Sequence, residues 1–154
     1  MVIGIFGESC TGKSTLAQAL SQALGCKVYS GKDYARMAKG EVEARESFIK
    51  LLKSFEQSEE TVLYVISEKE HICFLPEKAL RVLVTAGLET IQNRFAKRMN
   101  GNLPTAAGVM LEKKHGMFEG EQHDVHVESD KESTRTACER ILRMVGKGRE
   151  DEVG

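Results

Sequence analysis

The sequence contains no tryptophan, only two prolines and four cysteines. The absence of tryptophan excludes no class of fold. The scarcity of proline argues against a proline-rich linker, and no repeat with a period of about 20–50 residues is visible. The cysteines are far apart and include no C-x-x-C pair, which disfavours a zinc site or a disulfide framework. A reducing, cytoplasmic setting is therefore expected. The four positions are Cys10, Cys26, Cys73 and Cys138.

The chain also lacks a long apolar run and an excess of charge of one sign. No stretch approaches the roughly 20 apolar residues that span a bilayer, and the N-terminus lacks the basic region and cleavage site of a signal peptide. The formal net charge is −1, from 22 basic and 23 acidic side chains, which disfavours coating of a nucleic acid polymer. The expected partners are small molecules, with no membrane and no nucleic acid, and the chain is expected to be a monomer or a dimer.

The 154 residues suffice for one domain, and strand-like runs alternate with helical stripes along them. This alternation predicts an α/β fold with a mainly parallel sheet. A single domain is expected over residues 1–146, with a flexible tail over 147–154. The stretch 101–120 has little β signal and is interpreted as a mobile excursion. The predicted strands are 2–6, 27–29, 61–66, 81–84 and 125–127; the predicted helices cover 16–24, 48–55, 88–99 and 137–145.

A complete G-x-x-x-x-G-K-[ST] motif follows the first strand and opens the first helix, the context in which this motif binds phosphates. Its glycines let backbone N–H groups converge on an anion, and the helix N-terminus adds partial positive charge. Lys13 is predicted to contact the β and γ oxygens of ATP, and the Ser14 hydroxyl to hold Mg²⁺. Glu8 is interpreted as a variable loop position, and Cys10 as a small loop residue or a reactive thiol. The predicted nucleotide-binding residues are Gly7, Glu8, Ser9, Cys10, Thr11, Gly12, Lys13, Ser14 and Thr15.

From this loop onward the sequence resembles nucleoside monophosphate kinases, and cytidylate kinases in particular. Residues 7–15 look like the G-x-S-G-S-G-K-S-T loop of that family, with Cys10 in place of a glycine. Residues 30–36 are similar to its S-G-x-x-Y-R acceptor motif, with the arginine displaced by one position. The resemblance implies a P-loop three-layer sandwich, in which helices flank a five-stranded parallel sheet and a flexible lid covers approximately residues 98–121.

Two further segments carry the resemblance, and one departs from it. Residues 81–86 are similar to the strand before the lid helix, and residues 123–129 to the last strand, whose following loop packs on the nucleotide base. After the third strand, where cytidylate kinases carry G-R-D, this chain reads Ser67-Glu68-Lys69-Glu70.

Several side chains are candidates for the transfer itself, each with a plainer alternative. Asp33 is a candidate base or a helix N-cap. Arg94 and Arg98, four residues apart on one helix face, are candidate lid cations or a solvated basic surface. Glu68 is a candidate for orienting Mg²⁺, or part of a solvated charge run. The predicted catalytic residues are Lys13, Asp33, Arg94 and Arg98, and the predicted metal ligands are Ser14 and Glu68. The predicted substrate-binding residues are Ser30, Asp33, Tyr34 and Arg36. Tyr34 is alternatively a partly buried core residue.

Two functions follow from these residues. The first is an ATP- and Mg²⁺-dependent small-molecule kinase that resembles cytidylate kinases and transfers the γ-phosphate to a nucleotide or another small acceptor. The second is a nucleotide-binding module, or degenerate kinase, without acceptor phosphorylation. Neither the acceptor nor a preference for ATP over GTP is specified by any motif.

Overall fold

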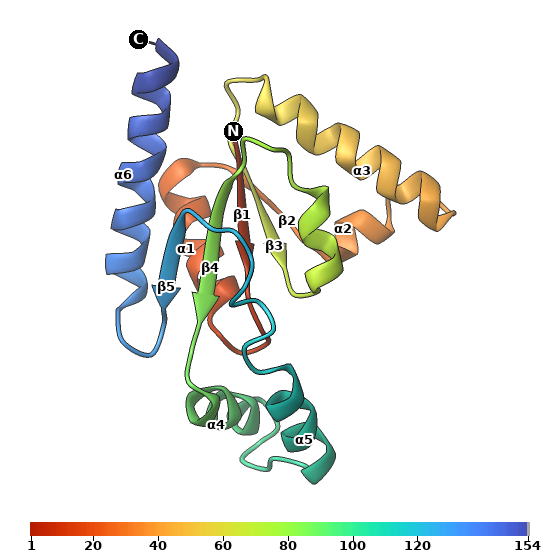
Figure 1. Ribbon diagram of the computed structural model, residues 1–154, viewed down its shortest axis with the longest axis vertical. Helices are drawn as coiled ribbons and strands as arrows, with labels where there is room; N and C mark the ends of the chain where they lie inside the picture. The colour runs from red at the N-terminus through yellow and green to blue at the C-terminus, as the bar shows by residue number, and fades with distance from the viewer. Residues whose placement is uncertain (154) are drawn as a thin grey trace.

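The protein is an α/β sandwich built on a five-stranded parallel sheet with the strand order β2-β3-β1-β4-β5 (Figure 1). The computed structural model describes the backbone of residues 1–153 and the side chains of residues 1–147. The predicted fold class is confirmed, and all five predicted strands are present within one or two residues of the expected bounds. The strands are β1 (Val2–Phe6), β2 (Lys27–Tyr29), β3 (Val62–Ile66), β4 (Leu80–Thr85) and β5 (Val125–Glu128).

Helices cover both faces of this sheet. Helices α1 and α6 pack on one face, and α3 with the short helix η1 covers the other. Helices α4 and α5 lie beyond the carboxyl ends of the strands (Figure 1). No helix in residues 1–153 is long and apolar enough to cross a membrane. The helices are α1 (Lys13–Leu24), α2 (Gly31–Ala35), α3 (Glu41–Glu56), the 3-10 helix η1 (Lys69–Phe74), α4 (Leu88–Arg98), α5 (Thr105–Lys114) and α6 (Thr134–Val153).

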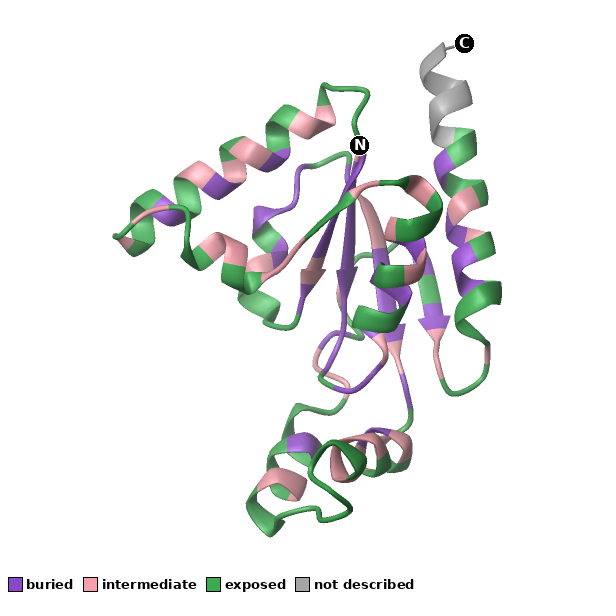
Figure 2. Ribbon diagram, turned by 180° about the vertical axis from the view of Figure 1, so that it is seen from behind, coloured by how far each residue is buried: buried purple, intermediate pink, exposed green. Residues whose placement is uncertain are grey.

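The central strand β1 shows why the sequence forms this sandwich. Every residue of β1 is buried, and successive side chains point to opposite faces of the sheet. Ile3 and Ile5 pack in the cluster beneath α1 and α6, whereas Val2 and Phe6 pack in the cluster beneath α3 and η1. A strand buried on both faces needs a continuous apolar run, which is the pattern seen in the sequence. Figure 2 shows this burial concentrated on the sheet.

Three short helices were not predicted. Helices α2 and η1 have five and six residues, too few for a helical repeat to be visible in sequence. Helix α5 lies inside the excursion predicted for 101–120, and it buries only Leu111, so it carries no apolar stripe. Helix α6 continues to Val153, into the segment predicted to be a flexible tail. That prediction is not tested, and Gly154 lies outside the described residues.

Helices α4 and α5 form a small unit of their own at the carboxyl edge of the sheet. Their shared core contains Ile91 and Leu111, together with Ala86 and with Cys10 from the first loop. Most other residues of the two helices are exposed or half-buried (Figure 2). Helix α5 lies within the range 98–121 at which the resemblance puts a lid, and α4 immediately precedes that range. The two helices together are called the lid below, and the flexibility of this lid stays a prediction.

Candidate functional site, a phosphate loop beside a helical lid

The two glycines of the motif sit where no other residue fits the backbone. A Cβ on Gly7 would clash with the backbone carbonyl oxygen of Val84 on the neighbouring strand. Gly12 has a φ of 99°, a left-handed conformation that glycine adopts without a steric penalty. The loop therefore turns sharply between β1 and α1, while it touches β4 with its backbone.

Lys13 is the buried cation of this loop. Its side chain is directed back into the loop, where Nζ donates hydrogen bonds of 2.6 Å to the carbonyl oxygens of Gly7 and Glu8. The residue is only 5% exposed. Burial lowers its pKa from the usual 10.5 to about 8, although Cys10 and Glu8 nearby oppose this effect. A desolvated ammonium group gains strongly from an incoming anion.

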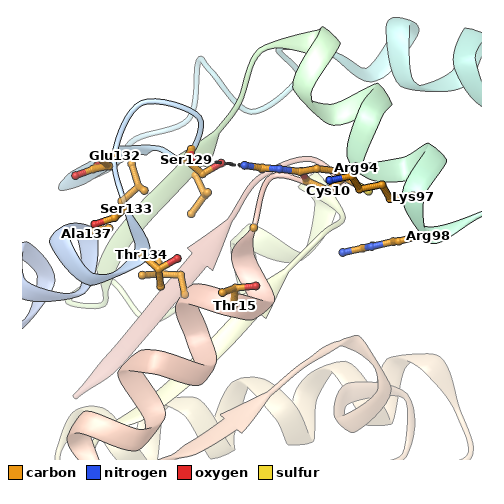
Figure 3. A pocket seen from close by; sticks show the side chains of 14 residues that line it. Cys10, Thr15, Arg94, Lys97, Arg98, Ser129, Glu132, Ser133, Thr134 and Ala137 are labelled. Carbon is orange, nitrogen blue, oxygen red and sulfur yellow. Dashed lines mark hydrogen bonds between the residues drawn. The ribbon is translucent and has the colours of Figure 1, made fainter. Parts of the chain in front are cut away.

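Arg94 of α4 joins the lid to the phosphate loop. Its Nη1 donates to the Cys10 carbonyl at 3.1 Å and to the Ser129 hydroxyl at 3.0 Å. The Ser129 hydroxyl in turn donates to the carbonyl oxygen of Thr11. Ser129 follows β5, so one guanidinium group connects the lid, the loop and the turn before α6 (Figure 3).

A cavity of about 470 Å³ opens beside this contact, within the size range of small-molecule sites. Arg94, Lys97 and Arg98 line it from α4, and Gly12 and Thr15 line it from the loop and α1. The structure thus brings together the two predicted arginines and three residues of the predicted loop, Cys10, Gly12 and Thr15, as Figure 3 shows for the labelled side chains. The predicted site residues include neither Lys97 nor the opposite wall, although the loop after the last strand is expected to approach the nucleotide base. That wall consists of Ser129, Glu132, Ser133 and Thr134.

The two residues predicted for the metal are both exposed to solvent. Ser14 lies at the start of α1 and lines a second cavity of about 270 Å³, which Ser30 also lines. Glu68 follows β3, and its carboxylate is 3.5 Å from the ring of His71. Oxygen ligands beside a phosphate site suit Mg²⁺, and Ser14 fits this requirement better than Glu68, which is already paired. Joint binding of a metal by Ser14 and Glu68 stays a prediction.

The predicted substrate residues cluster around α2. Oδ2 of Asp33 accepts hydrogen bonds from the backbone N–H of Ser30 at 2.8 Å and from its hydroxyl at 3.3 Å. This contact forms a capping box, so Asp33 caps α2 from its third position and not as the N-cap. Tyr34 is half-buried, with its ring 5.0 Å from that of Phe74, which agrees with the core alternative. Arg36 is exposed at the end of α2.

Beneath α2 lies a buried hydroxyl group whose hydrogen bonds are not satisfied. The Tyr64 hydroxyl has no hydrogen-bond partner among residues 1–147, and burial raises the pKa of Tyr64. The ring of Tyr64 packs edge-on against Phe48 at 4.9 Å, and Phe48 packs against Tyr34 at 6.0 Å. A buried hydroxyl without a partner is costly.

Glu8 has a role that sequence reasoning missed. From the sequence, Glu8 is interpreted as a variable loop position, and the structure shows that its side chain is buried, with only 8% exposed. Its carboxylate accepts a hydrogen bond of 2.6 Å from the backbone N–H of Gly116 and lies 3.1 Å from Nδ1 of His115. These partners are more than 100 positions away in the sequence, and no local pattern indicates the contact.

Comparisons with known proteins identify the fold. No protein-family model matches the sequence, and no curated protein does. An uncharacterized protein from Eubacterium ventriosum is similar in structure, with a TM-score of 0.72 and 20% identity over 95% of this chain and 98% of that one. Shikimate kinase from Acinetobacter baumannii, solved in complex with shikimate, has a TM-score of 0.65 and 17% identity over 96% of this chain and 93% of that one. A gluconokinase from Sinorhizobium meliloti has a TM-score of 0.64 and 16% identity over 97% of this chain and 96% of that one. The chain therefore has the fold of P-loop kinases.

Proposed function

We propose that this protein is an ATP- and Mg²⁺-dependent small-molecule kinase. The observation that carries the proposal is the buried ammonium group of Lys13 inside a complete phosphate loop, beside a cavity lined by three cations of α4. Phosphoryl transfer depends mainly on positioning and charge neutralisation, and this arrangement provides both. The similarity in fold to a shikimate kinase and a gluconokinase supports the same class of reaction.

The phosphate-donor half of the site is assigned to the loop and the cavity of about 470 Å³. The loop amides and Lys13 bind the β and γ phosphates, and the nucleoside occupies the cavity between α4 and the turn before α6. The Ser14 hydroxyl holds Mg²⁺, which supplies further neutralisation of phosphate charge when bound. Arg94 and Arg98 stabilise the phosphate charge from the lid side. Arg94 also holds the loop beside Ser129, through its contacts with Cys10 and the Ser129 hydroxyl.

The acceptor is assigned to the region of α2, on the other side of Ser14. Ser30 shares a cavity with Ser14, so a ligand hydroxyl beside Ser30 lies near the metal residue. Asp33 uses Oδ2 for the capping box, and Oδ1 takes part in neither capping contact, so Oδ1 is the atom proposed to accept the acceptor proton. Tyr34 and Arg36 frame the acceptor. A nucleotide acceptor, as in cytidylate kinases, and a non-nucleotide polyol are both compatible with these groups.

The test is a phosphorylation assay with ATP·Mg²⁺ and a panel of nucleoside monophosphates, sugars and hydroxy acids, read by ADP release and by product mass. Candidate acceptors are first ranked by the rise that each causes in the melting temperature with ATP present. Wild type is expected to phosphorylate at least one acceptor, and Lys13→Met to phosphorylate none. If no acceptor turns over and Lys13→Met leaves ATP affinity unchanged, the proposal is wrong.

A matched pair of variants separates the two roles of Asp33. Asp33→Asn keeps an oxygen for the capping contact but cannot take a proton, and is expected to lower kcat by about 10²–10⁴-fold. Ser30→Ala removes the hydroxyl contact to Asp33 and is expected to cost about 1 kcal/mol of stability, with a much smaller effect on kcat. Equal kcat values for wild type and Asp33→Asn would leave Asp33 with the capping role alone.

The second candidate is a nucleotide-binding module without transfer. The pairing of Glu68 with His71 favours it, because that carboxylate stands where the resembled family carries a functional motif. This candidate predicts heat of ATP binding in calorimetry with no acceptor-dependent ADP release. Any acceptor that raises ADP release well above background hydrolysis excludes it.

A further inference from the structure

The phosphate loop is bonded to both ends of the lid. Arg94, in the first lid helix, donates to the carbonyl oxygen of Cys10. Glu8, two residues earlier in the loop, accepts from Gly116, two residues after the second lid helix ends. The loop and the lid are also joined by packing, because the Cys10 side chain lies in the lid core with Leu111.

The contact between Glu8 and the lid exit is buried and has two defined partners. The carboxylate is buried, and its two oxygens have different partners: Oε1 accepts from the Gly116 N–H at 2.6 Å, and Oε2 lies 3.1 Å from the His115 ring. A buried carboxylate without partners would cost several kcal/mol, by an order-of-magnitude estimate. Gly116 has a φ of 81°, so the exit from α5 turns sharply and presents its amide to the loop.

The segment after Gly116 is fixed to the body of the protein. Phe118 is 1% exposed and packs in the cluster beneath α3 and η1. Its ring lies 6.1 Å from that of Phe6, the last residue of β1. Movement of the lid at its C-terminal end must therefore occur before Phe118, at His115 and Gly116, which are the two residues that Glu8 holds.

Glu8 links this hinge to the phosphate-binding lysine. Its carboxylate holds the lid exit, while its backbone carbonyl accepts from Lys13 Nζ at 2.6 Å and from the Thr11 hydroxyl at 2.8 Å. A phosphate that draws Lys13 away removes a donor from that carbonyl, and its negative charge repels the carboxylate. The repulsion acts directly on the carboxylate that holds Gly116, and the lost contact loosens the backbone that positions this carboxylate.

We propose that Glu8 is a positioning residue that holds the lid exit on the phosphate loop and transmits the occupancy of the loop to the lid. The residues that carry this are Glu8, His115 and Gly116. The transmission step rests on the proposed nucleotide function, whereas the holding step does not. By linkage, a ligand that weakens the contact is itself bound more tightly when the contact is absent.

Trypsin reports on this contact directly. Lys113 and Lys114 end α5, are exposed, and immediately precede His115. Cleavage there requires local opening of the lid exit, and its rate follows the population of the open form. In the free protein, Glu8→Ala is expected to raise the cleavage rate about tenfold, because it removes the oxygen that accepts from the Gly116 N–H. Glu8→Gln keeps an oxygen for the Gly116 N–H and is expected to stay near wild type. Glu89→Ala removes an exposed acid of α4 and is the matched control.

Near-ultraviolet circular dichroism and melting curves establish that each variant is folded. If Glu8→Ala fails to fold, His115→Ala is measured in its place, with a smaller increase expected because Gly116 keeps its bond. Equal cleavage of wild type and the folded variant would overturn the holding step, and so would a Glu8→Gln rate equal to that of Glu8→Ala.

The second arm adds ATP·Mg²⁺ and follows binding by calorimetry in the same samples. ATP is expected to accelerate cleavage after Lys113 and Lys114 in wild type by about threefold or more, and to leave the rate in Glu8→Ala unchanged. Binding with an equal change of rate in both proteins would overturn transmission through Glu8. Absence of binding heat would overturn both the proposed function and transmission, while the rates in the free protein still decide the holding step.

Discussion

The lowered pKa of Lys13 predicts how nucleotide affinity depends on pH. The drop from 10.5 to about 8 means that the buried site disfavours the charged amine by about 3 kcal/mol. Only the charged amine attracts phosphate, so the free protein must be protonated at Lys13 before it binds tightly. The affinity of wild type for ATP is therefore expected to fall roughly tenfold between pH 7 and pH 9.

Two variants isolate this effect in titration calorimetry. Lys13→Met has no titrating group at this position; it is expected to bind ATP about 10²–10⁴-fold more weakly, through the loss of charge-assisted hydrogen bonds, and with little change over this pH range. Lys13→Arg stays charged throughout and is expected to lose the pH dependence as well. A wild-type affinity that is constant from pH 7 to pH 9, or a Lys13→Met variant that keeps the wild-type slope, would refute the reasoning.

The same amine has a signature in the stability of the free protein. Because its pKa is lower in the folded than in the unfolded chain, the unfolded chain binds more protons between about pH 8 and 10.5, and stability rises with pH in that window. Below about pH 8 the full cost of the buried charge is present. Urea unfolding of wild type should show this rise, and that of Lys13→Met should not. The exposed Lys53 of α3 provides a control, since Lys53→Met should behave like wild type.

Three further predictions concern the framework of the site, and each is measured by urea unfolding or calorimetry. Gly7→Ala is expected to destabilise the protein by about 1–3 kcal/mol because its methyl group meets the Val84 carbonyl; Gly120→Ala, with no atom within 4 Å of its new Cβ, should change stability little. Ile141→Ala should cost about 2–5 kcal/mol, since this fully buried residue anchors α6 to the sheet. Arg94→Lys should weaken ATP binding about tenfold, because lysine cannot contact both the Cys10 carbonyl and the Ser129 hydroxyl as the guanidinium group does. An unchanged ATP affinity would show that these contacts do not contribute to binding.

The parts of the fold that could be predicted are those whose signal is local. Strand β1 is a continuous apolar run because it is buried on both faces, and α1 begins at the motif and ends at Gly25, whose φ is 62°. Helix α5 could not be predicted, because it packs through Leu111 on another small helix and has no apolar stripe. Its burial depends on a neighbour and not on its own periodicity.

The same distinction applies to the site. The phosphate loop is a backbone structure of consecutive residues, so a contiguous motif specifies it. The contact of Glu8 with Gly116 and that of Arg94 with Cys10 join residues that lie more than 80 positions apart, and nothing near Glu8 or Arg94 in the sequence indicates these partners. Asp33 shows a further limit, since the same residue in the same place suits a cap and a base, and only the contact to Ser30 shows that it caps α2 from its third position.

The charges around the loop suggest why a lid should be bonded to it at all. Under the proposed function, Lys13 exchanges two carbonyl contacts for a phosphate partner, and Glu8 beside it carries the opposite charge. With one buried carboxylate that must keep its own partners, the arrival of an anion raises the cost of the Gly116 contact at the lid exit. The Lys13 ammonium group then favours binding of the phosphate, and the repulsion between the phosphate and the Glu8 carboxylate transmits that binding to the lid.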